Sequence, residues 1–334
     1  VLSDDLFIRM GLSIKASIME SGWIYSPLLG HFASALCASL LMNATQDQTV
    51  NAIGIAYSQA SGNQQASTDT ALTKRMQPAF AARSGVFSAY LAKAGISGAR
   101  NVLDGQYNFY RVYLQNKCDR DILTRDLGKT YWIPTLSWKP YPVCGLAISG
   151  ASTVKALMDK WNINWKNITR IDLGVTQQTK AIVVFPEETK YDPRTVVDAQ
   201  FSLPFAVAAM VVRGHLGLGD VTMEGIQDSN IRSVMSKIHV YIDENLEAKY
   251  ARGVSPTRVT IHTTAGQFSD CLYPKGHPSN PFRWEDMCDK FMDALQYGVY
   301  PGKAEMILNM IYHLEALEDI TELIQVINHA FVRQ

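Results

Sequence analysis

Two cations stand side by side at Lys74 and Arg75, directly before a stretch in which Ala, Ser and Gly recur every three or four residues. Small residues at that spacing allow a helix to pack tightly against its neighbours, and Pro78 stands where the first turn of a helix tolerates proline. A helix start also carries partial positive charge and backbone N–H groups. The pattern indicates an anion site at this helix start, and a solvated basic pair before a core helix is the alternative.

A second lysine, Lys139, lies with Tyr141 in the run W-K-P-Y-P-V-C that begins at Trp138. Its two prolines stiffen the backbone into an extended path, and the period of two then places Lys139 and Tyr141 on the same side. Such a rigid strand is suited to hold a carboxylate at a cleft between domains. An interdomain linker with an exposed lysine is the alternative.

Two later segments carry further candidates. In the run D-A-Q-F-S-L-P-F, Asp198 is predicted to cap a helix, while Gln200 and Ser202 are able to donate hydrogen bonds to a ligand. In the run P-K-G-H-P-S-N-P-F, His277 stands between Gly and Pro, where it is either a turn residue or a substrate contact.

Hydrophobic periodicity divides the chain into a helical part and a mixed part. The first part is predicted to hold helices at Ser3–Glu20, Gly30–Leu41, Gln46–Ala60 and from Lys74 on, with a polar loop at Gly62–Thr70. The second is predicted to hold strands at Thr169–Val175, Ala181–Phe185, Lys237–Ile242 and Arg258–Thr263, and helices at Ser152–Lys160 and Asp198–Arg213. We therefore expect a two-domain protein: an all-α helical domain (1–133), an α+β lid domain (134–283), and helices (284–334) that return to the helical domain.

Composition excludes several classes of protein. Lys plus Arg and Asp plus Glu both number 31 in 334 residues, so no net charge favours nucleic acid or an anionic membrane. No apolar run reaches membrane-spanning length. Five cysteines without a C-x-x-C pair argue against a disulfide framework and favour the cytoplasm. The absence of a Gly-rich dinucleotide loop and of a metal-ligand cluster predicts neither cofactor nor metal.

The four segments, in this order and spacing, resemble the MmgE/PrpD family, and the resemblance covers nearly all of the chain. The resemblance rests on four motifs: T-K-R-x-Q-P-x-x-A-A-R-x-G from Thr73, K-P-Y-P-x-C from Lys139, D-A-Q-F-S-L-P-F from Asp198, and G-H-P-x-N-P from Gly276. That family includes 2-methylcitrate dehydratases, cis-aconitate decarboxylases and iminodisuccinate epimerases. The resemblance implies a helical domain with an α+β lid, a homodimer, and a small di- or tricarboxylate as substrate.

The first functional hypothesis is a cofactor-independent lyase or isomerase that acts through an enolate-like intermediate, by dehydration, decarboxylation or epimerisation. Fixed cations must stabilise such an intermediate, and a base must remove a proton from the carbon beside a carboxylate. We predict that Lys74, Lys139 and Tyr141 are catalytic, with Lys74 or Tyr141 as the base. Substrate binding is predicted for Arg75, Gln200 and His277.

The second hypothesis is a catalytically impaired or half-site subunit that binds anions without turnover. Ile24 and Ile148 stand where the family usually has histidines, and the family's acidic D-D-x-H region corresponds to a segment before Val1. On this hypothesis a partner chain supplies the missing N-terminal region.

Overall fold

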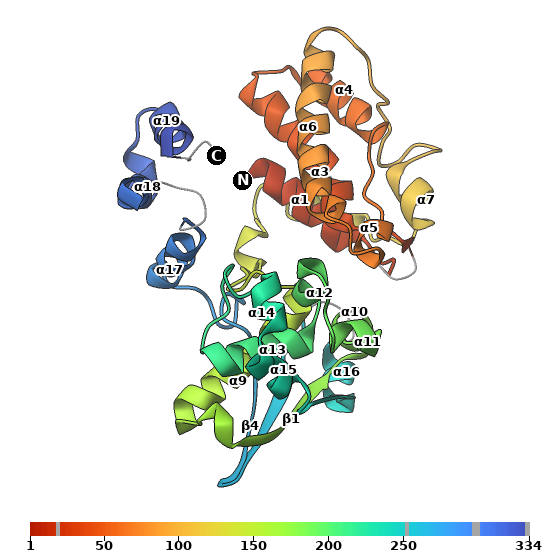
Figure 1. Cartoon of the computed structure of the whole chain (residues 1–334). Helices are drawn as coiled ribbons and strands as arrows, with labels where there is room; N and C mark the ends of the chain where they lie inside the picture. Colours follow the sequence, from red (N-terminus) through yellow and green to blue (C-terminus); the bar gives the residue numbers. More distant parts are fainter. Residues whose placement is uncertain (18–20, 251–253, 296–300, 331–334) are drawn as a thin grey trace. The chain divides into compact units, whose positions relative to one another are not determined.

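The chain divides into two compact units, Val1–Leu136 and Ser137–Gln334. The computed structural model describes residues 1–17, 21–250, 254–295 and 301–330 (Figure 1). In its described residues the first unit contains helices and no named strand: α1 (Leu2–Ser13), α3 (Tyr25–Leu41), α4 (Gln46–Tyr57), α5 (Gln65–Thr68), α6 (Thr73–Lys93), α7 (Phe109–Leu114) and α8 (Asp121–Thr124).

Small side chains allow α3, α4 and α6 to pack closely, as the Ala, Ser and Gly spacing predicts. Their shared core consists only of buried alanines together with the half-buried Met42 and Ile55. The tightest approach lies at Gly85 of α6, where a β-carbon would stand 2.0 Å from Ser34 Oγ and 2.6 Å from the Ala35 nitrogen. The α3–α6 contact therefore depends on the missing side chain at position 85.

A buried arginine holds the end of the first unit against α1. Arg9 is 2 % exposed, and its Nε donates to Asp5 Oδ2 at 2.6 Å. Its two terminal nitrogens donate to the carbonyl oxygens of Ile122, Arg125 and Thr130 at 3.0, 2.7 and 2.7 Å. One guanidinium thus pairs with a carboxylate and satisfies three loop carbonyl groups, which compensates for its burial.

The second unit contains a four-stranded mixed sheet in the order β2-β1-β3-β4. Its strands are β1 (Ile168–Val175), β2 (Ile238–Ile242), β3 (Thr257–Thr263) and β4 (Gly266–Leu272). β1 pairs in parallel with β2, with Ile171 opposite Ile238, and antiparallel with β3, with Ile171 opposite Ile261. These strand residues share one core with helices α9 (Gly145–Trp161), α13 (Leu203–Arg213) and α15 (Ser229–Met235), which gather beside the strands in Figure 1.

Helix α13 is the most buried element of the second unit. Leu203 to Val211 are all buried, which identifies a helix that is apolar on every side. Ser202 caps it by accepting the Phe205 N–H at 3.0 Å, and Gly214 ends it with a positive φ of 73°.

The remaining helices of this unit are short or lie towards the C-terminus. They are α10 (Gln177–Val183), α11 (Glu187–Lys190), α12 (Val196–Gln200), α14 (Met223–Gln227), α16 (Glu244–Tyr250), α17 (Trp284–Leu295), α18 (Pro301–Tyr312) and α19 (Thr321–Ala330). The last three share a small core centred on Ile307 and Leu323. Their return to the helical domain stays a prediction.

Two sequence-based predictions for the second unit were wrong, and one strand was missed. The apolar run Ala181–Phe185 lies largely in helix α10, because Thr176 accepts the Thr179 N–H and caps a helix there; a short apolar run alone does not distinguish a strand from a buried helix. The predicted helix Asp198–Arg213 is two helices, α12 and α13, separated by the Ser202 cap. Strand β4 was not predicted.

Asp198 does not cap its helix from the N-cap position. Thr195 is the N-cap of α12, and Asp198 completes a capping box as the third helical residue. Its Oδ2 accepts from the Thr195 N–H at 3.0 Å and from Thr195 Oγ1 at 2.9 Å.

Two predictions for the first unit also need correction. Helix α1 ends at Ser13 rather than Glu20, and residues 18–20 lie outside the described part of the chain. Pro78 lies inside α6, which begins at Thr73, and therefore beyond the first turn.

The close α3–α6 approach predicts opposite effects for two Gly→Ala changes. Gly85→Ala should lower the free energy of unfolding of the first unit by about 1–3 kcal/mol, because Ser34 and the α3 backbone must move. Gly11→Ala is the matched control, since a β-carbon there would meet only Leu29 Cδ1 at 3.8 Å, and should be neutral or stabilise by up to about 1 kcal/mol. Hydrogen exchange of the α3 and α6 amides measures both. Equal effects would contradict the steric account.

Buried His31 predicts a pH dependence of the first unit. Its Nε2 accepts the Ser61 N–H at 3.3 Å and its Nδ1 lies 3.0 Å from Ser84 Oγ, so both ring nitrogens are used by the neutral form. Burial lowers the pKa of His31 below its ordinary 6.5. Because the unfolded chain takes up the proton first, stability should be full above pH 6.5 and decline as the pH falls below it, by at most about 1.4 kcal/mol per pH unit.

The substitution His31→Asn should flatten this decline, measured as the exchange rate of α3 amides between pH 7.5 and 5.5. The control His313→Gln changes an exposed histidine and should leave the decline of stability with falling pH unaltered. If stability still declined as steeply with falling pH in the His31 variant, the pH dependence would not come from His31.

Candidate functional site

The segment from Trp138 to Cys144 is held at both ends by other motifs. The Trp138 N–H donates to the Gly276 carbonyl at 2.8 Å, and the Cys144 N–H donates to the Gln200 carbonyl at 2.7 Å. The Gln200 side chain also donates to the Pro142 carbonyl at 3.1 Å. Three of the four motifs that the sequence singled out therefore meet in the second unit.

Gly276 makes the first of these contacts sterically feasible. Its φ is +87°, and a β-carbon there would stand 2.2 Å from the Trp138 carbonyl oxygen. The same loop is closed by the Asn280 N–H, which donates to the His277 carbonyl at 2.7 Å. Only glycine fits both the left-handed backbone and the close approach.

The held segment is bent rather than a strand, so the period of two does not apply to it. Pro140 and Tyr141 line a cavity, whereas the Lys139 ammonium turns back and donates to the Val143 carbonyl at 3.2 Å. Lys139 and Tyr141 therefore have different surroundings, and the predicted shared face was wrong.

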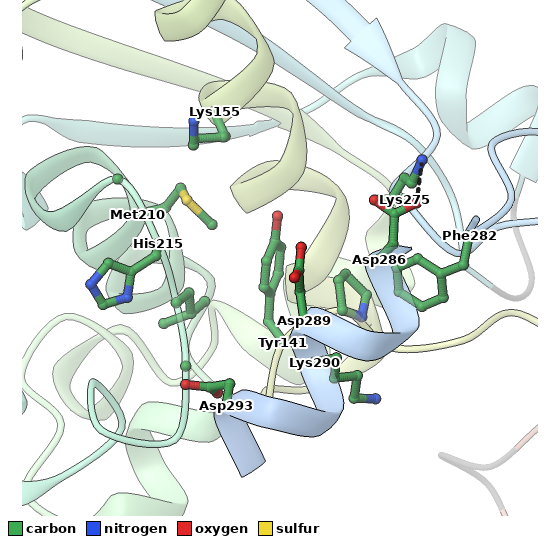
Figure 2. Close-up of a pocket in the computed structure, with 14 residues that line it drawn as sticks. Tyr141, Lys155, Met210, His215, Lys275, Phe282, Asp286, Asp289, Lys290 and Asp293 are labelled. Carbon is green, nitrogen blue, oxygen red and sulfur yellow. Dashed lines mark ion pairs between the residues drawn. The ribbon is translucent and has the colours of Figure 1, made fainter. Parts of the chain in front are cut away.

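The cavity has a volume of about 810 Å³ and lies within the second unit (Figure 2). One wall comes from Tyr141 and Lys155, and a second from Met210 and the loop that follows α13. The polar face of α17 supplies the third wall through Asp286, Asp289, Lys290 and Asp293. The cavity thus carries charge of both signs on well-separated elements.

Lys290, which lines this cavity, lies next to Lys139. The Lys290 ammonium donates to the Lys139 carbonyl at 2.5 Å. Partial burial, and then the charge of Lys139, lower the pKa of Lys290. Among the described residues neither lysine pairs with a carboxylate, and each donates to a backbone carbonyl instead. A bound anion would relieve their repulsion, so the pair favours a negatively charged ligand.

The acidic residues near the cavity are in part already neutralised. Lys275 pairs with Asp286 at 2.9 Å, as Figure 2 shows, and the pKa of Asp286 is lowered by the Arg283 N–H and by Lys275. Lys155 pairs with Asp159. The pair formed by Lys139 and Lys290 differs from these two lysines in lacking such a partner.

Tyr141 projects between α9 and α17 in Figure 2. Burial raises its pKa above the ordinary value of 10, so the phenol keeps its proton at neutral pH. A protonated phenol is suited to donate a hydrogen bond or a proton, and a role as proton donor fits the surroundings better than the predicted role as a base.

The two other predicted site residues of this unit have structural partners. Gln200 holds the Pro142 carbonyl, as described above. His277 accepts the Ser279 N–H at its Nδ1 at 3.0 Å and stacks on Tyr273 with ring centroids 4.1 Å apart, while burial lowers its pKa. Contact of either residue with substrate stays a prediction.

Lys74 and Arg75 belong to the first unit, at the start of α6. Their backbone N–H groups donate to the Ala71 and Leu72 carbonyls at 3.1 and 2.9 Å, because the helix begins with a tight turn. The predicted anion site at this helix start must therefore rely on the two side chains. That Lys74 and Lys139 act in one site stays a prediction.

The two isoleucines at positions where the resemblance leads us to expect histidines have ordinary structural roles. Ile148 is 4 % exposed within the core of the second unit. Ile24 is the N-cap residue of α3, and its N–H donates to the Gly62 carbonyl at 2.8 Å. Neither contributes a titratable group.

Comparisons with known proteins agree with these motifs. The MmgE/PrpD N-terminal domain matches residues 5–120, and the MmgE/PrpD C-terminal domain matches residues 141–316. The chain belongs to the MmgE/PrpD family. The predicted family and its two-part architecture are thereby confirmed.

Curated members of this family are similar to the chain at low identity. A cis-aconitate decarboxylase-like protein oryM of Aspergillus oryzae is 25% identical, over 94% of this chain and 66% of its own length. Cis-aconitate decarboxylases of Aspergillus terreus and Homo sapiens are 22% and 24% identical, over 96% and 89% of this chain and 68% and 61% of their own lengths. The chain thus spans about two thirds of the length of these relatives.

Two further observations concern metal ions and membrane-spanning helices. The described residues contain no group of three or more His, Cys, Asp or Glu side chains arranged to hold a metal ion. In the same part of the chain, every helix is too short or too polar to cross a membrane.

Sequence reasoning missed Lys290 as a site residue, although the fourth motif leads into it. It also gave no role to His215, which lines the cavity. Both lie far in sequence from Lys139 and Tyr141. Lys290 belongs to the K-F pair that ends the fourth motif, whereas no local pattern included His215.

The loop contact at Gly276 predicts a local effect of substitution. Gly276→Ala should raise the hydrogen-exchange rate of the Trp138 amide about tenfold or more, because the added carbon separates it from its acceptor. Gly128→Ala is the control, since Gly128 has a similar φ of +76° with nothing within 4 Å of its β-carbon position. Mass spectrometry of peptides that cover residues 137–144 measures the effect. Unchanged exchange in the Gly276 variant would contradict the contact.

Proposed function

We propose that this chain is a cofactor-independent lyase that acts on a small polycarboxylate, and that cis-aconitate or a similar tricarboxylate is its substrate. The observation that carries the proposal is the lysine pair Lys139 and Lys290, which has no carboxylate partner among the described residues and of which Lys290 lines a large cavity. The printed names of the relatives, which are cis-aconitate decarboxylases, support the substrate class.

The proposed chemistry follows from the charges. A substrate with several carboxylates binds to fixed lysines, which need no reorganisation when further negative charge develops. Loss of CO₂ or of a proton beside a carboxylate leaves an electron pair on carbon, delocalised into the neighbouring carboxylate as an enolate-like dianion. In this proposal Lys139 and Lys290 bind and orient the substrate carboxylates, and the Tyr141 phenol supplies a proton.

A second candidate is an anion-binding subunit without turnover. It is favoured by Ile24 and Ile148, which stand where the family usually has histidines and carry no titratable group. Binding without any chemical change of the ligand distinguishes this candidate from the first. We further propose that the protein forms a homodimer, which light scattering would test.

The proposal predicts a charge-dependent binding site. Titration calorimetry with tricarballylate, a saturated tricarboxylate, should give binding to the wild type that Lys139→Gln and Lys290→Gln each weaken by about tenfold, equivalent to about 1.4 kcal/mol. Lys166→Gln is the control, because Lys166 is exposed on the same unit and stacks near Trp165 away from the cavity. Equal binding by all four proteins would overturn the proposed site.

Turnover of cis-aconitate, followed by CO₂ release, separates the two candidates. With an active wild type, Lys139→Ala should mainly raise KM, and Lys74→Ala should mainly lower kcat. Binding without CO₂ release or any other change of the ligand would favour the subunit without turnover.

A further inference from the structure

A glycine-rich loop, Gly214–Asp220, follows α13 and folds around one buried carboxylate. Asp220 is 2 % exposed. Its Oδ1 accepts from Arg213 Nη1 at 2.7 Å, and its Oδ2 accepts from the Gly217 N–H at 2.7 Å. The same Oδ2 lies 2.8 Å from His215 Nδ1. Asp220 therefore fixes both the path of the loop and the orientation of the imidazole.

His215 lies on the wall of the cavity that also contains Tyr141 and Lys290 (Figure 2). Its side chain is 70 % exposed, in contrast to its partner Asp220. Because an ionised carboxylate only accepts hydrogen bonds, this contact favours the tautomer with its proton on Nδ1. In the neutral imidazole the lone pair is then on Nε2, the nitrogen that the aspartate does not occupy.

Asp220 and its neighbours form a cluster of charged groups behind this histidine. Arg213 bridges two carboxylates, since its other terminal nitrogen donates to Asp228 Oδ2 at 3.2 Å. Two negative charges thus face one guanidinium, and His215 lies against one of them. A histidine beside a buried aspartate is an arrangement that general base catalysis uses.

We propose that His215, oriented by Asp220, is the acid–base residue of this cavity and exchanges a proton with the carbon beside a carboxylate of the bound polycarboxylate. This inference rests on the proposed function and adds to it the group that moves the proton. The C–H bond breaks and an N–H bond forms at Nε2, while the electron pair stays on the substrate as an enolate-like dianion. The reverse transfer returns the proton to carbon.

The other polar groups of the cavity are less suited to this step. Tyr141 retains its proton because burial raises its pKa. Asp286 is committed to Lys275 at 2.9 Å, and the lysine pair provides charge for binding. Ile24 and Ile148 cannot transfer a proton, and in this proposal His215 provides that function instead.

Proton exchange at carbon tests the inference without requiring net turnover. cis-Aconitate is incubated with the protein in D₂O, and deuterium incorporation is followed by NMR. The wild type should exchange the protons beside the carboxylate, and His215→Asn should lower the rate by about 100-fold or more while calorimetric affinity for tricarballylate changes less than about twofold. His239→Asn is the matched control, because His239 is also exposed and lies 3.4 Å from Asp172, but on the sheet and not on this cavity; its exchange rate should equal that of the wild type.

The role of Asp220 is that of a positioning residue, and a spectroscopic readout tests it. Nitrogen NMR of labelled protein at pH 8 should show His215 protonated at Nδ1. Asp220→Asn keeps an oxygen for Arg213 but places an amide NH₂ opposite His215, so the proton should move to Nε2 and carbon exchange should be lost.

The outcomes separate the inference from the function on which it rests. If the wild type binds tricarballylate but His215→Asn exchanges as fast as the wild type, His215 is not the acid–base residue and the binding function stands. An Nε2-protonated His215 in the wild type would overturn the inference independently of any activity. If the wild type does not bind tricarballylate, both the proposed function and the inference fail.

Discussion

The candidate site depends on the way in which a segment that cannot join a sheet is held at its ends. Pro140 and Pro142 remove two backbone donors from the segment between Trp138 and Cys144, so ladder hydrogen bonds cannot fix it. The Gly276 carbonyl holds one end, and Gln200, through its carbonyl and its side chain, holds the other. This arrangement brings Tyr141 to the cavity and makes the Lys139 carbonyl the acceptor for Lys290.

Charge around the cavity follows a consistent pattern. Lysines that have carboxylate partners, such as Lys275 with Asp286, are neutralised locally and serve the structure. Lys139 and Lys290 donate to backbone carbonyl groups instead. Behind the loop that carries His215, the buried Asp220 pairs with Arg213 through Oδ1, and its Oδ2 lies 2.8 Å from His215 Nδ1. In the proposal, anion binding and proton transfer therefore fall to different elements of one unit.

The first unit obeys a different constraint, the close approach of helices through small residues. Gly85 lies against Ser34 and Ala35, and the buried face of α6 consists of Gln77 and residues no larger than serine. Such packing leaves little freedom for the α6 backbone, and it orients the first turn that carries Lys74 and Arg75. The motif that identified the family is therefore in large part a packing motif.

The sequence by itself determined the family, the helical and mixed parts, three of the four strands and the motif residues, because periodicity and motif spacing are local properties. It failed at 181–185 and at Asp198, where caps supplied by Thr176 and Thr195 decide the helix boundaries. Only the tertiary structure decided that Tyr141 reaches the cavity while Lys139 turns to a carbonyl, and that Lys290 and His215 join them. Those residues come from three segments distant in sequence, and their proximity is a property of the tertiary structure that no local pattern encodes.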